Sequence, residues 1–423
     1  MSSIFLPSPV QSALQGWAKR MRERADLPLS IAWGEAPEHQ LSLGRSDPPR
    51  VRLRIRQASA VAALLSPNLD NLGQAYVEGQ IDLDGSAADI MQLAWQLAEL
   101  DAQGQAEKKG GGLLGRIAHR LSQAVAHTRQ ADKEAIQYHY DVSNDFYAEW
   151  LDPAMVYSCA YFERGDETLA EAQMKKIDHI LTKIRLEPGQ RLLDIGCGWG
   201  ALVIRAAQKY GARCVGITLS QNQFDLATER VKAAGLAGQV EIRLEDYRDV
   251  KGPFDRITSV GMFEHVGLKN LSTYFKIIHD LLTPEGWAMN HGITSTDPDN
   301  GETSHGGGRF IDRYVFPEGE LPHIGTVLTT LQQGGLEAVD VENLRRHYAR
   351  TLGCWSEAFE ARTERIKSLV DEKRWRIWRV YLIGCQWVFE QDQIAIFQVL
   401  CRRAGQMAQT LPWSRRWMYP NPA

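Results

Sequence analysis

The sequence has few cysteines and no long apolar run. The six cysteines are scattered without a Cys-x-x-Cys pair, which fits neither a zinc site nor a disulfide framework and is typical of a reducing cytoplasm. They are Cys159, Cys197, Cys214, Cys354, Cys385 and Cys401. No stretch is long enough to span a bilayer. The N-terminus lacks a basic region followed by an apolar run, so we expect no signal peptide. If the protein contacts a membrane, we expect it to do so from one side.

An excess of positive charge is also absent. The formal net charge is −4, which argues against a nucleic-acid partner. A hydrophobic content of 44% and a charged content of 24% are those of a soluble globular protein. A chain of 423 residues has room for two or three domains and a substantial core.

The most informative stretch is a short apolar strand followed by glycines. Residues 191–200 read RLLDIGCGWG, and Ala201–Tyr210 has the apolar spacing of a helix. A strand, a glycine turn and a helix allow a nucleotide-like ligand to lie against bare backbone at the helix N-terminus. The same pattern also occurs in tight turns that bind nothing.

The residues that follow the other expected strands favour one kind of nucleotide. Asp194, at the end of the first strand, suits the amine-bearing end of S-adenosylmethionine better than a pyrophosphate. A dinucleotide-binding fold favours an acidic residue after the second strand, whereas this chain has Thr218, Ser220 and Gln223. The next two strands end in Glu245-Asp246-Tyr247 and Glu264-His265. The succession predicts an α/β fold, a class I methyltransferase Rossmann-like domain.

Three regions are expected along the chain. Residues 1–100 read as a small α+β domain, 101–134 as a linker with an amphipathic basic helix at 113–130, and 135–423 as the catalytic domain with helical lid insertions. The strand at 51–56 alternates apolar residues with arginines. It and the basic helix are consistent with a solvated edge strand and a packed helix, or with contact to anionic phospholipid.

Aromatic residues gather in two other places. Residues 134–162, before the glycine turn, could cover the cofactor as a lid. The helical region 347–388 carries several tryptophans, and both plain core packing and the lining of an acyl-chain tunnel explain them.

Six segments together resemble the cyclopropane-fatty-acyl-phospholipid synthase family. They are HYDVSNDFY at 139–147, YSCAYF at 157–162, LDIGCGWG at 193–200, SVGMFEHVG at 259–267, YVFP at 314–317 and, in the N-terminal region, LGQAYVEG at 72–79. The resemblance runs from about residue 135 to the C-terminus. It implies transfer of a methyl group from S-adenosylmethionine to a cis double bond of a phospholipid acyl chain. The resulting carbocation then loses a proton and closes a cyclopropane ring.

The resemblance also implies a set of catalytic residues. The base would be a bound bicarbonate in a cage formed by Cys159, Glu264, His291, Ile293 and Tyr348, with Cys385 packed near the acyl chain. Other interpretations stay open for three of them. Glu264 and His265 could serve merely to cap the helix after the fourth strand. His291 could be a structural histidine. The local match around Tyr348 is short.

The cofactor site implied by the resemblance spans several strand ends. Its residues would be Tyr157, Ser158, Asp194, Gly196, Gly198, Thr218, Leu219, Gln223, Asp246 and Tyr247. The resemblance further implies a homodimer that associates peripherally with the inner face of a bacterial cytoplasmic membrane.

One departure from the family leaves the product open. The segment 297–308 is richer in glycine and polar residues than is usual in the family. It follows the cage residues and could direct the cation to a methyl branch or a methylated alkene. A lipid C-methyltransferase is therefore the alternative. A non-catalytic lipid-binding protein and a small-molecule methyltransferase are further alternatives.

Overall fold

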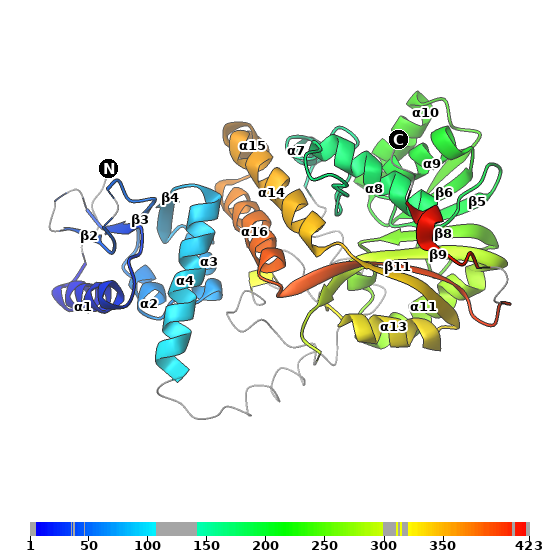
Figure 1. Ribbon diagram of the computed structural model, residues 1–423. Coiled ribbons are helices and arrows are strands. Elements are labelled where there is room, and N and C mark those ends of the chain that lie inside the picture. The colour runs from blue at the N-terminus through cyan, green and yellow to red at the C-terminus, as the bar shows by residue number, and fades with distance from the viewer. Residues whose placement is uncertain are drawn as a thin grey trace. The chain divides into compact units, whose positions relative to one another are not determined.

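A computed structural model describes residues 6–34, 36, 39–45, 47–106, 142–298, 310–311, 314, 320–407 and 411–419. The helix expected at 113–130 and most of the segment 297–308 lie outside these residues. The chain forms two compact units (Figure 1). The first comprises Met1–Val125, Glu302–Pro317 and Thr363–Trp387, and the second comprises Ala126–Gly301, Glu318–Arg362 and Val388–Ala423.

The first unit contains a four-stranded sheet in the order β2-β1-β3-β4. Its strands are β1 (Leu29–Ala32), β2 (Gln40–Ser42), β3 (Val51–Ile55) and β4 (Ile81–Asp84). Its helices are α1 (Ser8–Arg24), α2 (Ala60–Leu65), α3 (Leu69–Val77), α4 (Ala87–Ala106) and α15 (Thr363–Leu369), with α16 (Glu372–Glu390) up to Trp387. The α+β character expected for the N-terminal region is confirmed.

Strand β3 is an inner strand, so the interpretation of residues 51–56 as an edge strand is wrong. Its apolar residues are buried and its arginines are exposed, as the alternation predicts. The arginines lie opposite acidic residues of β4: Arg52 is paired in register with Asp84, and Arg54 with Asp82. Arg56, directly after β3, forms an ion pair with Asp82 of β4.

Helix α16 completes the first unit although it lies almost 300 residues further along the chain. The Arg376 guanidinium donates to the carbonyl oxygens of Tyr76 (2.9 Å) and Ile81 (3.0 Å) and pairs with Asp82 (2.8 Å). The Trp387 ring lies 6.1 Å from that of Trp95. The domain boundaries expected from the sequence do not include these later segments in the N-terminal domain. Those boundaries stay a prediction.

The second unit is built on a seven-stranded sheet in the order β10-β11-β9-β8-β5-β6-β7. The strands are β5 (Arg191–Ile195), β6 (Arg213–Thr218), β7 (Val240–Leu244), β8 (Phe254–Val260), β9 (Leu282–Ser295), β10 (Leu336–Asn343) and β11 (Ile394–Arg403). The pairs from β9 to β7 are parallel, whereas β11 runs antiparallel to both β9 and β10. The Rossmann-like α/β class predicted from the sequence is confirmed.

Helices cover both faces of this sheet (Figure 1). The helices of this unit are α7 (Asn144–Ala148), α8 (Leu169–Lys183), α9 (Ala201–Tyr210), α10 (Gln221–Ala233), α11 (Leu271–Leu281), α13 (Ile324–Gln333) and α14 (Arg345–Ala361). Helices α8 and α9 pack on one core cluster, and α11 and α13 pack on the other. Within the described part of the chain, no helix is long and apolar enough to cross a membrane.

The glycine turn joins β5 to α9. Gly196, Gly198 and Gly200 have φ values of 77°, 54° and 84°, a region that side-chain-bearing residues rarely adopt. The backbone N–H groups of Gly196 and Cys197 donate to the carbonyl oxygen of Ile217, at 3.0 and 2.9 Å. These two bonds hold the turn against the end of β6, so the strand ends form one edge that can receive a ligand.

Candidate active site

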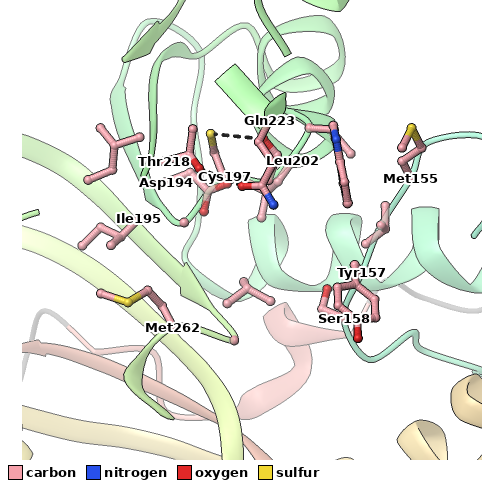
Figure 2. A pocket seen from close by; sticks show the side chains of 18 of the residues that line it. Met155, Tyr157, Ser158, Asp194, Ile195, Cys197, Leu202, Thr218, Gln223 and Met262 are labelled. Carbon is pink, nitrogen blue, oxygen red and sulfur yellow. Dashed lines mark hydrogen bonds between the residues drawn. The ribbon is translucent and has the colours of Figure 1, made fainter. Parts of the chain in front are cut away.

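A cavity lies at the carboxyl ends of β5 and β6, beside the glycine turn (Figure 2). Nine of the ten predicted cofactor residues line it: Tyr157, Ser158, Asp194, Gly196, Gly198, Thr218, Leu219, Gln223 and Tyr247. Asp246 is not among the lining residues. Its carboxylate is bound by the guanidinium of Arg248 at 2.6 and 2.8 Å, and Glu245 lines the cavity instead.

Buried hydrogen bonds fix the polar groups at these strand ends. The Thr218 hydroxyl donates to Gln223 Oε1 (2.7 Å), and the Thr258 hydroxyl donates to Asp194 Oδ1 (2.7 Å). Burial raises the pKa of Asp194 to about 7. The cavity thus has a carboxyl group beside bare glycine backbone, with neutral oxygen atoms on the next strand.

The aromatic stretch expected to form a lid packs on residues of the cavity. Trp199 Nε1 donates to Asn144 Oδ1 (2.8 Å), and the Asn144 amide donates to the carbonyl of Asn222 (3.2 Å). The Tyr147 ring lies 5.1 Å from that of Trp199 and 5.6 Å from that of Tyr157. Helix α7 is therefore attached to the glycine turn from outside the sheet. Residues 134–141 of the same stretch lie outside the described residues.

Glu264 and Ile293 are brought together by adjacent parallel strands. Glu264 follows β8, and its Oε1 accepts the backbone N–H of Ile293 on β9 at 2.7 Å. This contact is made to a neighbouring strand, so the helix-cap interpretation of Glu264 is wrong. Its Oε2 is buried and has no partner among the described residues. Burial raises the pKa of Glu264 to about 7.

His291 is fully buried on β9, paired in register with Val260 of β8. Neither ring nitrogen has a hydrogen-bond partner among the described residues. Burial, with the positive charges of Lys176 and Lys183, holds the pKa of His291 well below its ordinary value. The imidazole is therefore neutral and offers one donor and one acceptor. A buried structural histidine is normally hydrogen-bonded, and the described residues supply no such bond to this one.

The other predicted catalytic residues lie on different elements. Cys159 is fully buried, and its thiol donates to the carbonyls of Ala160 (3.2 Å) and Leu344 (3.8 Å), the latter at the start of α14. Tyr348 is buried on α14, with its ring 4.7 Å from that of Phe389. Cys385 is half-buried on α16, in the first unit.

Two polar residues of α8, one in the cavity wall and one behind it, were not predicted from the sequence. Lys176 on α8 lines the cavity, and its ammonium donates to Ser158 Oγ at 2.8 Å. Gln173, one turn earlier, donates to the carbonyl oxygens of Ser158 (2.8 Å) and Val156 (3.2 Å). Both share the buried face of α8 with Ile177 and Ile180. Long polar side chains on an otherwise apolar face were the signal that could have revealed them.

These residues suit S-adenosylmethionine. The described residues contain no group of histidine, cysteine and acidic side chains that could hold a metal. The Asp194 carboxyl group suits an ammonium, and Thr218 with Gln223 suits ribose hydroxyls. The glycine turn leaves space for a nucleoside.

The fold and the cavity define a class I S-adenosylmethionine-dependent methyltransferase. A similar solved structure is mycolic acid cyclopropane synthase CmaA1 complexed with SAH and CTAB, with 38% identity and a TM-score of 0.61, covering 64% of this chain and 98% of that one. Cyclopropane synthase MmaA2 from Mycobacterium tuberculosis has 36% identity and a TM-score of 0.62, covering 64% and 97%. Coclaurine N-methyltransferase, at 20% identity and a TM-score of 0.62, shares the fold.

The chain belongs to the mycolic acid cyclopropane synthetase family, whose model matches residues 127–399. Residues 17–105 match a domain of unknown function. A probable fatty acid methyltransferase from Pseudomonas putida is 43% identical over 93% of this chain and 96% of its own length. The cyclopropane-fatty-acyl-phospholipid synthase of Escherichia coli is 36% identical over 82% of this chain and 89% of its own length. The family expected from the sequence motifs is confirmed.

Proposed function

We propose that this enzyme adds a methylene group from S-adenosylmethionine to the cis double bond of an unsaturated phospholipid acyl chain, giving a cyclopropane ring. In support, the relative from E. coli is named for this reaction, and several mycobacterial relatives are named cyclopropane mycolic acid synthases. The alkene carbon forms a bond to the methyl group as its bond to sulfur breaks, and S-adenosylhomocysteine leaves. The carbocation then loses a proton from the new methyl group, and the remaining electron pair closes the ring.

The observation that carries the proposal is a set of buried polar atoms near β9 that have no hydrogen-bond partner among the described residues. Glu264 Oε2 and both ring nitrogens of His291 lack partners among the described residues. A buried polar atom without a hydrogen bond costs about 1–3 kcal/mol. Such a set, on the turn after β8 and on the adjacent strand β9, is therefore suited to a small polar guest that has both donors and acceptors.

We propose that this guest is bicarbonate and that it accepts the proton. The Glu264 carboxylate can accept its O–H, and the neutral His291 can donate to one of its oxygen atoms. The backbone N–H of Cys159 and the hydroxyl of Tyr348 would complete the cage, as the family resemblance implies. Ile293 holds the Glu264 carboxylate through its own N–H.

Aromatic walls would protect the carbocation. Tyr157 lines the cavity, and its ring lies 5.2 Å from that of Trp355 and 5.5 Å from that of Trp150. Trp150 and Trp355 are fully buried. Aromatic faces stabilise a cation without attacking it, and their bulk excludes the water that would trap it as an alcohol.

The substrate implies a location. We propose that the enzyme works in the cytoplasm, bound peripherally to the inner face of the cytoplasmic membrane, as a homodimer. Flotation with anionic liposomes at low and high salt tests the membrane contact, and no binding at low salt would contradict it. Sedimentation of the purified chain tests the dimer.

The experiment that tests the proposed function measures the chemical change in the acyl chain. Purified enzyme, labelled S-adenosylmethionine and liposomes of cis-monounsaturated phospholipid are incubated with and without bicarbonate, and lipids are analysed by mass spectrometry and NMR. We expect gain of one CH₂ unit, loss of the alkene signal and dependence on bicarbonate. A product of equal mass that retains alkene protons would instead identify a lipid C-methyltransferase, the activity for which the relative from P. putida is named in broad terms.

The variant Glu264→Gln tests the cage. It keeps an acceptor for Ile293 N–H but loses the negative charge, so turnover should fall about 10²–10⁴-fold while S-adenosylhomocysteine still binds. The control is Glu241→Gln, which alters an exposed carboxylate paired with Arg243. Equal turnover in both variants would exclude Glu264 from the reaction.

A further inference from the structure

Lys176 is a buried ammonium in the wall of the cofactor cavity. Lys176 is 2% exposed and lies in the middle of α8. A capping box between Thr168 and Glu171 fixes the start of this helix. The ammonium donates to Ser158 Oγ at 2.8 Å. Lys176, Ser158 and Asp194 all line the same cavity.

No acidic side chain of the described part of the chain neutralises this charge by direct contact. Among the described residues, Lys176 makes no ion pair, and its hydrogen-bond partner Ser158 is uncharged. The groups that act on it from a distance are Cys159, Asp194 and Asp152. Asp152 is engaged by the N–H groups of Ala154 (2.9 Å) and Val156 (2.8 Å).

A lysine ammonium has three donors, and a buried one is costly unless it is paired with an anion. Consistent with this, burial lowers the pKa of Lys176 to about 8. The spare donors of Lys176 lie at a cavity that receives a ligand with an α-carboxylate. Hydrogen bonds from a charged donor to a carboxylate are the strong ones in proteins.

We propose that Lys176 binds the α-carboxylate of the methionyl end of S-adenosylmethionine, opposite the carboxyl group of Asp194, which suits the α-amino group. The two residues form a bipolar subsite for a zwitterion. Ser158 positions the lysine through its hydroxyl. The inference rests on the cofactor of the enzyme class and is independent of which lipid is modified.

The subsite has a defined effect on catalysis. The α-carboxylate is not altered by methyl transfer, so Lys176 contacts it equally in S-adenosylmethionine and in S-adenosylhomocysteine. Binding of this kind lowers KM without raising kcat. Lys176 is therefore a positioning and affinity residue, and its loss should raise KM for S-adenosylmethionine while kcat stays within about 3-fold.

The test combines a variant with a truncated ligand. Titration calorimetry on the full chain compares S-adenosylhomocysteine with 5′-methylthioadenosine, which keeps the nucleoside and the thioether but lacks the amino-acid end. Lys176→Met should weaken binding of S-adenosylhomocysteine about 10-fold or more and change that of 5′-methylthioadenosine by less than about 2-fold. Lys232→Met, on the exposed side of α10, should change neither.

Two outcomes would overturn the inference. An equal loss for both ligands would show that Lys176 only maintains the cavity, and unchanged binding of both would show that the carboxylate is bound elsewhere. If Lys176→Met fails to fold, the unmodified enzyme provides the test. It should bind decarboxylated S-adenosylmethionine about 10-fold more weakly than S-adenosylmethionine, and equal affinities would contradict the subsite. None of these measurements depends on the lipid product.

Discussion

Gly292 connects the packing of the sheet to the position of the proposed base-binding carboxylate. It lies on β9 between His291 and Ile293, and a Cβ atom at this position would overlap Cε1 and Cδ1 of the Phe263 ring. Phe263 is fully buried and precedes Glu264 in the chain. The substitution Gly292→Ala therefore forces the Phe263 ring to move, and Glu264 with it.

The size of the effect follows from the contact distances. Carbon atoms pack at about 3.5–4.0 Å, so the ring must shift by about 2 Å from its present position. Overpacking of this kind costs about 1–3 kcal/mol in a protein core, equivalent to a fall in Tm of several degrees in a unit of this size. Misplacement of a catalytic group by about 1 Å costs about 100-fold in rate. We expect at least this loss in turnover.

Three measurements separate the two effects. Thermal unfolding reports the packing cost, turnover on liposomes reports the displacement of Glu264, and calorimetry with S-adenosylhomocysteine should show affinity within about 3-fold of normal. Gly238→Ala is the matched control, because a Cβ atom there meets nothing within 4 Å. Turnover and Tm of Gly292→Ala equal to those of the control would refute the coupling of Phe263 to Glu264.

Two further predictions concern the lid and the buried carboxyl group. Asn144→Ala removes the hydrogen bonds to Trp199 and to the Asn222 carbonyl. Calorimetry should therefore show that S-adenosylhomocysteine binds about 10-fold more weakly. Unchanged affinity would show that α7 does not contribute to cofactor binding. Burial raises the folded-state pKa of Glu264 from 4.5 to about 7, so its contribution to stability is complete below pH 4.5 and is lost as the pH rises through 7. Glu264→Gln, which does not ionise, should therefore gain Tm relative to the unmodified protein at pH 8.5 and lose this advantage by pH 5, and parallel Tm curves would contradict the shift.

Most of the residues predicted to lie together do line one cavity, because they follow strands of the same sheet. A strand, its glycine turn and the next helix are local in the chain, so their order fixes where Asp194, Thr218 and Gln223 meet. The prediction is less accurate after β7. Side chains of an extended segment alternate in direction, and the motif Glu245-Asp246-Tyr247 does not show which acid faces the cavity. In the structure Glu245 does, while Asp246 binds Arg248.

Lys176 and the composition of the first unit could not be read from the motifs for a different reason. A lysine in a helix is usually solvated, and its burial depends on where the helix packs in three dimensions. The contacts of Arg376 with Tyr76 and Ile81 join positions almost 300 residues apart. Such pairs follow no periodicity in the sequence, so only the folded chain reveals them.

The strand order of the second unit has a consequence for how the enzyme is made. Strand β11, near the end of the chain, is inserted between β9 and β10. Until the ribosome has synthesised Ile394–Arg403, β9 has one unpaired edge and β10 has no neighbour in the sheet. An exposed strand edge favours aggregation. The strand that carries His291 and Ile293 therefore gains its second neighbour only near the end of synthesis. A chain terminated before β11 would contain most of the sheet but would expose an unpaired edge of β9, which favours aggregation.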